Sequence, residues 1–327
     1  MPTCSVAKAL RLAWAAAAAL LFVATTDDPA AAQASNAPPV VEFHAGDRIA
    51  FVGDSFFERE YPRGLIETAL TVAHPEKALT FRNLGWSGDT VRGESRAYFG
   101  KAADGYGELL KSVDLVKPTV IFLSYGANES FDGSARLDAF ITDYRRLLDD
   151  LASRTTRIVL LTPLPADRTT TPLPAAALGE RNRVLSQYSA AIRTLAASRQ
   201  LAIIDIYTEM LGAMTRSEPE PLFEKGMHLT DAGYSVAAAQ IVARTGSSAP
   251  YARDARFSAL GALIVQKNEL FFHRWRPANV TYLYLFRQRE QGNNAVEIPR
   301  FDPLVAEKEK EIAAMTKALA FPSGGAR

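Results

Sequence analysis

Five short apolar runs alternate with longer amphipathic stretches, and this alternation constrains the fold more than any other feature of the sequence. The runs are the expected strands, at Ile49–Val52, Leu79–Leu84, Pro118–Ser124, Arg157–Leu161 and Leu201–Asp205. Strands separated by helices are joined by crossovers, which make neighbouring strands parallel. We therefore predict an α/β fold with a doubly wound, mostly parallel five-stranded sheet that is flanked by helices.

The stretches between the runs carry apolar residues at three- and four-residue spacing, which is typical of amphipathic helices. The expected helices are 62–73, 109–116, 134–152, 179–198 and 231–243, and Thr230 can N-cap the last of them. Beyond residue 247 the pattern changes to a helical or irregular extension. Residues 266–291 are rich in aromatics and arginine, and 302–317 predict a charged helix with little apolar face. Because its apolar content is small, we expect this extension to pack on the sheet domain.

The N-terminus has the pattern of a secretory signal peptide. Lys8 and Arg11 precede an apolar stretch, 13–24, that is too short to span a bilayer comfortably, and Ala32-Gln33-Ala34 offers a cleavage site. We predict a signal peptide over 1–34, a linker over 35–47, a catalytic domain over 48–247 and the extension over 248–327. The mature protein would then be exported, periplasmic or secreted, without a stable membrane span. An Ala-rich leader or an uncleaved anchor is the alternative.

Composition excludes several classes of function. The formal net charge of +1 over 327 residues gives no electrostatic reason to expect nucleic acid as a partner. Cys4 is the single cysteine, so no disulfide and no cysteine-based metal site can form within one chain. No residue cluster has metal-ligand spacing, and no glycine loop is suited to cradle phosphate. The sequence therefore predicts neither a metal nor a cofactor.

Polar residues follow the predicted strands at the points where they end. Ser55 follows the first strand in a Gly-Asp-Ser turn, Gly85 ends the second, Asn128 follows the third, and His228 precedes the last helix. These positions share one edge of a doubly wound sheet, so the side chains should converge. A hydroxyl, an imidazole to take its proton, and fixed donors for an oxyanion are what acyl transfer requires.

These four blocks, in this order, resemble the SGNH (GDSL-type) hydrolase family of esterases, lipases and carbohydrate deacetylases. The resemblance spans about Ile49 to Ala243 and implies the flavodoxin-like fold of that family. It implies that Ser55 is the nucleophile and that His228 is the general base. The Ser55 N–H, the Gly85 N–H and the Asn128 side chain would then form the oxyanion hole.

The sequence departs from the family pattern at the triad acid. The acid usually stands three residues before the histidine, where this chain has Lys225. A lysine cannot accept the imidazole Nδ1–H. We predict Glu224, one residue earlier, as the acid; the alternative is a Ser–His dyad in which a backbone carbonyl orients His228. A looser resemblance, in this segment and the C-terminal tail, is to exported GDSL-type proteins of planctomycete-like bacteria.

The predicted function is that of a serine esterase acting on carboxylic esters, acyl or acetyl, and on carbohydrate esters among them. One alternative is a weakly active or silent carbohydrate-binding or scaffold protein on the same fold, and another is an acyltransferase with the same triad.

We interpret Asp54 as a turn-stabilising residue and Asp89 as loop polarity. The aromatic stretch 267–289 is either a wall of the cleft or a latch against the sheet domain. The sequence indicates neither the substrate nor the oligomeric state.

Overall fold

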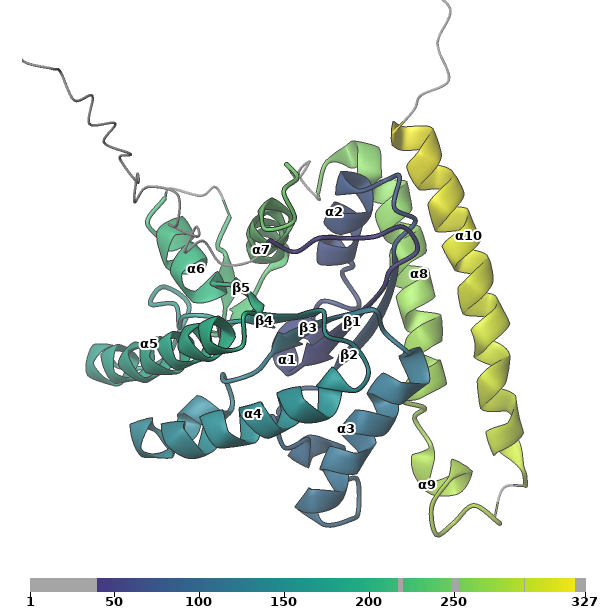
Figure 1. The fold of residues 1–327 in the computed structure, drawn as a ribbon, viewed down its shortest axis with the longest axis horizontal. Coiled ribbons are helices and arrows are strands. Elements are labelled where there is room, and N and C mark those ends of the chain that lie inside the picture. The colour runs from purple at the N-terminus through teal and green to yellow at the C-terminus, as the bar shows by residue number, and fades with distance from the viewer. Residues whose placement is uncertain (1–39, 217–219, 249–252, 291, 321–327) are drawn as a thin grey trace, which may run out of the picture. The chain divides into compact units, whose positions relative to one another are not determined.

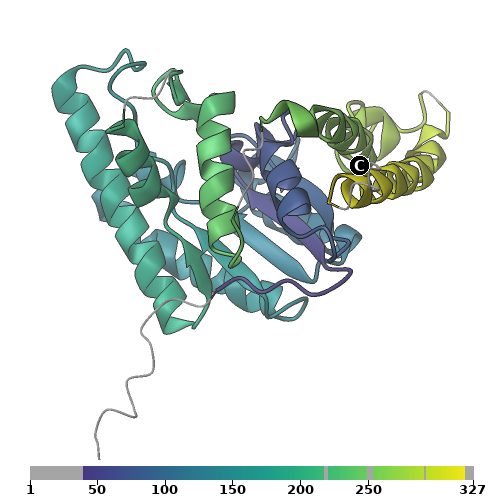
Figure 2. The same ribbon diagram turned by 90° about the horizontal axis from the view of Figure 1, so that it is seen from above.

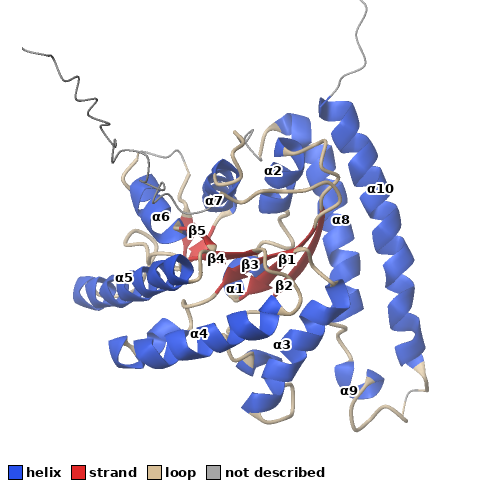
Figure 3. Ribbon diagram, in the orientation of Figure 1, coloured by secondary structure: helices blue, strands red, loops and turns tan. Residues whose placement is uncertain are grey.

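Five parallel strands form the central sheet of the computed structural model, which describes residues 40–216, 220–248, 253–290 and 292–320 (Figure 3). The strands are β1 (Arg48–Gly53), β2 (Thr80–Gly85), β3 (Val120–Ser124), β4 (Ile158–Leu161) and β5 (Ala202–Ile204). Their order is β2-β1-β3-β4-β5. The predicted α/β fold with its five-stranded sheet is therefore confirmed. The predicted signal peptide lies outside the described residues.

Helices cover both faces of the sheet, as Figure 1 shows. One face carries α2 (Leu65–Ala73), α6 (Ile206–Met214) and α7 (Asp231–Ala243), and the other carries α3 (Ala102–Val116), α4 (Leu137–Ala152) and α5 (Ala175–Ser198). Alternate strand residues explain the two layers, because side chains along a strand point to opposite faces. In β1, Phe51 packs in the core beneath α2, α6 and α7, whereas its neighbour Val52 packs in the core beneath α3, α4 and α5. Both side chains are buried.

Several element bounds differ from the sequence prediction. Helix α2 begins three residues late, because Gly64 precedes it with a left-handed φ of 62°. Helix α3 begins at Ala102 rather than 109, although Gly105 and Gly107 are poor helix formers. Helix α6 was not predicted. Helix α7 has the predicted bounds, and the predicted cap is confirmed because Thr230 Oγ1 accepts from the Gly233 N–H at 3.2 Å.

The C-terminal segment forms two long helices, α8 (Ser258–Trp275) and α10 (Phe301–Ala320), which pack against each other (Figures 1 and 2). Helix α8 also contacts α2 and the edge strand β2. Shorter pieces complete the described chain: η2 (Glu94–Arg96), η3 (Glu129–Asp132), η4 (Ser134–Arg136), η5 (Ala255–Phe257), η6 (Asn294–Arg300) and α9 (Val280–Leu283). Helix α10 is charged as expected, yet Val305 and Ile312 on it are buried. The domain boundary at residue 247 stays a prediction.

The strand order creates a switch point between β1 and β3. From β1 the chain first crosses to β2 on one side and then to β3 on the other. Ligands of open α/β sheets bind in the crevice outside the carboxyl ends of the strands at such a point. Gly53 and Ser124, the last residues of β1 and β3, are paired there. Among the residues described, no helix is both long enough and apolar enough to cross a membrane.

Candidate active site

Ser55 lies just beyond the carboxyl end of β1, as the first residue of the short helix α1 (Ser55–Glu58). Asp54 N-caps this helix, since its Oδ1 accepts a hydrogen bond from the Phe56 N–H at 3.0 Å. This bond confirms the turn-stabilising role predicted for Asp54. Ser55 is half-buried and lines a pocket at the switch point. The fold thus fixes the backbone of the serine while leaving its side chain accessible.

His228 reaches the same pocket from a hairpin of two short strands, β6 (Phe223–Glu224) and β7 (His228–Leu229). The turn of this hairpin needs Gly226, which has a left-handed φ of 75°. The Gly226 N–H donates to Thr170 Oγ1 at 3.0 Å and so ties the hairpin to the loop after β4. His228 is therefore held by a braced turn rather than by a free loop.

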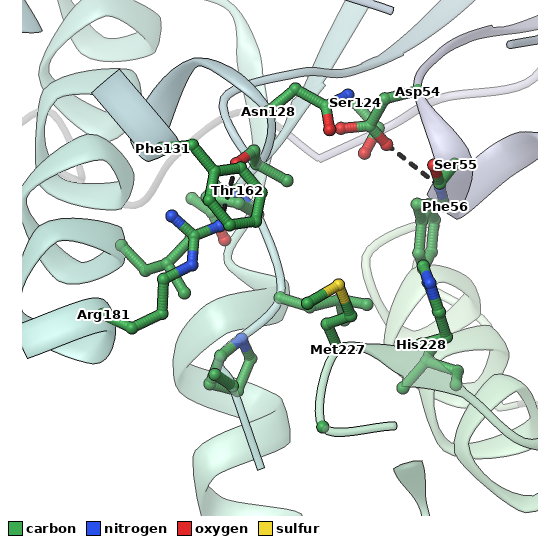
Figure 4. Close-up of a pocket in the computed structure, with 18 of the residues that line it drawn as sticks. Asp54, Ser55, Phe56, Ser124, Asn128, Phe131, Thr162, Arg181, Met227 and His228 are labelled. Atoms are coloured by element: carbon green, nitrogen blue, oxygen red, sulfur yellow. Dashed lines mark hydrogen bonds between the residues drawn. The ribbon is translucent and has the colours of Figure 1, made fainter. Parts of the chain in front are cut away.

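The predicted nucleophile and base lie at the same side of the pocket (Figure 4). No direct hydrogen bond joins Ser55 and His228, and such bonds are often loose before substrate binds. Burial lowers the pKa of His228 below its ordinary value, and the nearby Arg59 guanidinium lowers it further, while Glu224 opposes both. The imidazole is therefore neutral at pH 7, which is the form that can accept a proton.

Glu224 lies opposite His228 in the antiparallel β6–β7 ladder. Its carboxylate accepts a hydrogen bond from Arg59 Nη2, and Arg63 Nη2 lies 3.9 Å away. Lys225, at the usual position of the acid, is exposed. The structure thus brings Glu224 next to His228 but bonds its carboxylate to arginine. The assignment of Glu224 as triad acid stays a prediction.

Gly85 ends β2 beside α1, the helix that begins at Ser55. A Cβ at this position would lie 2.2 Å from the Glu58 backbone nitrogen, so only glycine permits this approach. The Gly85 N–H donates to Asn83 Oδ1 at 2.9 Å, and Asn83 Nδ2 donates to the Phe57 carbonyl at 2.7 Å. Gly85 does not line the pocket. An oxyanion would therefore have to compete with Asn83 for this predicted donor.

Asn128 lies in the loop after β3 and lines the pocket together with Ser55 and His228. Its Nδ2 donates one hydrogen bond to the Asp89 carbonyl at 2.7 Å. An amide nitrogen carries two N–H donors, so one remains for a ligand. The Asp89 carbonyl thus fixes the plane of the Asn128 amide at the pocket wall.

The interpretation of Asp89 as loop polarity is wrong. Asp89 and Arg96 are both fully buried, and Arg96 Nε donates to Asp89 Oδ2 at 2.6 Å. Tyr125 OH donates to the same oxygen at 3.1 Å. The Arg96 guanidinium also lies 5.4 Å from the Trp86 ring and 5.9 Å from the Trp275 ring. This buried ion pair holds the loop that orients Asn128.

Two further carboxyl groups lie next to predicted site residues: Asp54, which is buried, precedes Ser55, and Glu129, which is half-buried, follows Asn128. Glu129 accepts hydrogen bonds from the Val91 N–H at 2.8 Å and the Gly126 N–H at 2.9 Å. Burial raises the pKa of Glu129 to about 8 and that of Asp54 to about 7. The negative charge of Asp54 also raises the pKa of Glu129. The sequence alone did not identify Glu129 as a site residue. It belongs to no recognised motif, and its position directly after Asn128 is the only signal.

The rest of the pocket is mainly apolar, with one cation. Its apolar wall consists of Pro163, Leu164, Pro165, Ala166, Leu173, Leu185 and Met227. Phe131 and Arg181 face Ser55 and His228 from the opposite side (Figure 4). All lining residues lie between Asp54 and Tyr234, so none belongs to the described part of the C-terminal extension. That extension contributes Phe271 and Val305 to the core instead.

A parallel five-stranded α/β sheet, with a serine after β1 and a histidine before the last helix of the sheet domain, has the fold of the SGNH hydrolases. The chain belongs to the GDSL-like lipase/acylhydrolase family, whose sequence profile matches residues 51–236, more than half of the 327 residues. It is thus a member of a family of carboxylic ester hydrolases.

Solved structures share this fold at low sequence identity. A catalytic mutant of an acetylxylan esterase from Geobacillus stearothermophilus is 18% identical, with a TM-score of 0.50 over 63% of this chain and 96% of that one. A protein from Parabacteroides merdae described as a GDSL-like lipase is 16% identical, with a TM-score of 0.51 over 64% and 99%. A gut microbial diltiazem-metabolizing enzyme is 18% identical, with a TM-score of 0.48, and the match covers 64% of this chain but 49% of that one. No curated protein matches the chain.

Proposed function

We propose that this protein is a serine esterase that hydrolyses carboxylic esters at the pocket of Ser55, Asn128 and His228. The convergence of these three side chains at the switch point is the observation that supports the proposal most. Ser55 Oγ would attack the ester carbonyl while neutral His228 takes its proton. The Ser55 N–H, Asn128 and, after release from Asn83, Gly85 would stabilise the oxyanion. His228 then returns the proton to the leaving alcohol, and water hydrolyses the acyl-enzyme.

Covalent labelling tests the nucleophile. A fluorophosphonate probe should modify the wild type at Ser55, as peptide mass mapping would show, and should leave Ser55→Ala unlabelled. Ser87→Ala is a matched control, because Ser87 lies in the neighbouring strand-end loop and its backbone N–H bonds to Glu58. Labelling of Ser55→Ala at the wild-type rate would contradict the assignment.

Acetylated carbohydrate is the substrate class we propose first. The acetylxylan esterase that shares this fold motivates the choice. At 18% identity the likeness extends to the fold, and the substrate is our proposal. A panel of acetylated sugars and of fatty acyl esters, assayed with wild type and Ser55→Ala, tests it. A Ser55-dependent rate on the acyl esters that exceeds the rate on every acetylated sugar would count against it.

A weakly active or silent protein is the second candidate. The bond between Glu224 and Arg59 supports it, since a histidine without an acid partner activates serine poorly. Absent or very slow fluorophosphonate labelling of Ser55, together with no turnover of any ester, would favour this candidate. Transfer of the acyl group to added alcohols rather than to water would instead indicate an acyltransferase.

We also propose export through the predicted leader, residues 1–34, as in the exported planctomycete-type proteins that the sequence loosely resembles. N-terminal sequencing of the mature protein tests this. Processing near Ala34 supports export, and a retained Met1 contradicts cleavage.

A further inference from the structure

Arg181 is the cation of the proposed active-site pocket, and no carboxylate neutralises it. It lies on α5, half-buried, in the wall that faces Ser55 and His228 across the pocket (Figure 4). No described Asp or Glu oxygen lies within ion-pair distance of its guanidinium. Burial lowers the pKa of Arg181 to about 10, and Tyr188 is the one group that opposes this shift. A positive charge is thus held in a partly dry site without a counter-charge.

Two hydrogen bonds and one ring contact hold the Arg181 guanidinium in place without using all of its donors. Nη1 donates to Ser130 Oγ at 2.8 Å, and Nη2 donates to the Ala127 carbonyl at 2.9 Å. The Phe131 ring covers one face, 3.7 Å from the central carbon. A guanidinium has five N–H groups, so three remain. Nε has no hydrogen-bond partner and is not buried, so at least this donor can be reached from the pocket or from solvent.

Other arginines near the pocket lack this combination. Arg183, two residues further along α5, is exposed and forms an ion pair with Glu180 at 2.6 Å. Arg59 is bonded to Glu224. A cation that is pre-oriented and partly desolvated, but not neutralised, is suited to a carboxylate, which a guanidinium binds with geometric specificity.

We propose that Arg181 binds a carboxylate of the substrate, so that the preferred esters carry a negative charge on the part that lies in the pocket. The proposal rests on the esterase function proposed above and adds to it the charge that the preferred esters carry. The apolar wall between Arg181 and Ser55 fits a short aliphatic or ring segment that separates the carboxylate from the ester. Arg181 is in this view a specificity residue, which contacts substrate but takes no part in proton transfer.

Matched ester pairs test the preference. Monomethyl adipate and its neutral half-amide, methyl adipamate, differ only in a terminal charge on the acyl side. Acetylated 6-hydroxyhexanoate and acetylated 6-hydroxyhexanamide place the same difference on the alcohol side. For wild type, kcat/KM should favour the charged member by about 10-fold or more in at least one pair, as for a charge-assisted hydrogen bond.

Substitutions separate binding from a purely structural role. Arg181→Gln should bring that ratio to about one or below, and Arg181→Lys should retain part of it. Arg183→Gln, the neighbouring surface control, should leave the ratio unchanged. If Arg181 only braced Ala127 and Ser130, Arg181→Gln would slow both members of a pair equally and the ratio would persist. A persisting ratio would overturn the proposal, as would a wild type that prefers neither charged ester.

Binding to the inactive Ser55→Ala variant gives a second readout. Calorimetric titration should show that monomethyl adipate, or acetylated 6-hydroxyhexanoate, binds about 10-fold more tightly than its amide, and Arg181→Gln in the same background should remove the difference. Ser55-dependent hydrolysis of the neutral esters without a preference for charge would overturn this proposal alone. Absence of Ser55-dependent hydrolysis of every ester would overturn the esterase function and, with it, this proposal.

Discussion

Glu224 and His228 are direct partners across the β6–β7 ladder, yet the carboxylate of Glu224 bonds to Arg59. Directly opposed residues of an antiparallel pair have Cβ atoms about 4.5–5.5 Å apart, so a change of side-chain rotamer brings the carboxylate within reach of the imidazole. Arg59 lies on the turn that follows α1, the helix that begins at the predicted nucleophile Ser55. The same carboxylate can thus bond either to the predicted base or, as in the structure, to the segment that follows the predicted nucleophile.

Replacing the carboxylate of Glu224 should slow catalysis if this residue is the triad acid. We expect Glu224→Gln to lower kcat by about 100-fold, because the amide cannot stabilise the imidazolium that forms during proton transfer. Steady-state hydrolysis of a short-chain 4-nitrophenyl ester measures this. Glu180→Gln, which alters another arginine-paired glutamate on the surface, is the matched control. A loss below threefold would show that a backbone carbonyl orients His228 instead.

The acidic limb of the pH profile should lie below the ordinary range of histidine. Burial and Arg59 lower the pKa of His228, so its neutral, active form persists to lower pH. The midpoint of the acidic limb of kcat/KM should therefore fall below about 6.5. Arg59→Gln removes a cation that lowers this pKa, so the limb should move to higher pH. Arg183→Gln should not move it.

Rate profiles from pH 4 to 9 check both expectations. A wild-type midpoint above 7 would contradict the lowered pKa. An Arg59→Gln profile that moves to lower pH would show that the loss of the Glu224 contact outweighs the removed charge.

Asn128→Ala should remove an oxyanion donor. The Asp89 carbonyl fixes the Asn128 amide, and the second N–H is free to bind a developing negative charge. Loss of one such donor typically costs about 100-fold in kcat, with a smaller effect on KM. Asn128→Asp keeps the size of the side chain but places a negative charge at the oxyanion, so its loss should be at least as large. Equal thermal unfolding of both variants and wild type would exclude misfolding, and a kcat within threefold of wild type would refute the role.

The sequence was sufficient for the sheet because most strands are short apolar runs, as in Val120–Ser124, where every residue is buried, and because the mixed strand Thr80–Gly85 still stands between two amphipathic helices. Serine, asparagine and histidine could be placed at one edge because strand ends of a parallel sheet share that edge. The hairpin of Glu224 and His228 could not be predicted, since its strands are two residues each and carry no periodicity.

Residues whose role depends on tertiary burial were also missed. Asp89 and Arg96 are seven positions apart between β2 and α3, and tertiary packing, in which the Trp86 and Trp275 rings lie near the Arg96 guanidinium, makes their pair a buried one. Arg181 has the local sequence of a polar helix surface, and nothing in that pattern distinguishes it from Arg183. The pocket, formed by the loops after β3 and β4, creates the difference between the two.

Lys267 anchors the C-terminal extension from inside the core. Its side chain is about 1% exposed, and Nζ donates to Glu67 on α2, to the Phe81 carbonyl on β2 at 3.1 Å, and to Asn268 Oδ1 at 2.7 Å. Helix α8 is thereby bonded to the edge of the sheet. Removing one partner of a buried ion pair leaves the other charge uncompensated, which typically costs about 3–5 kcal/mol.

Lys267→Met should therefore lower the free energy of unfolding by about 3–5 kcal/mol, measured by urea denaturation. The double variant Lys267→Met/Glu67→Leu removes both charges and should recover most of that loss, since apolar pairs of similar volume replace buried ion pairs at little cost. Arg274→Gln is the control: it breaks the α8–α10 pair with Asp302 at the surface, which should change the free energy by less than about 1 kcal/mol. If Lys267→Met cost no more than Arg274→Gln, the buried pair would not be what attaches α8 to the sheet, and the apolar contacts of Leu260, Ile264 and Phe271 would hold it instead.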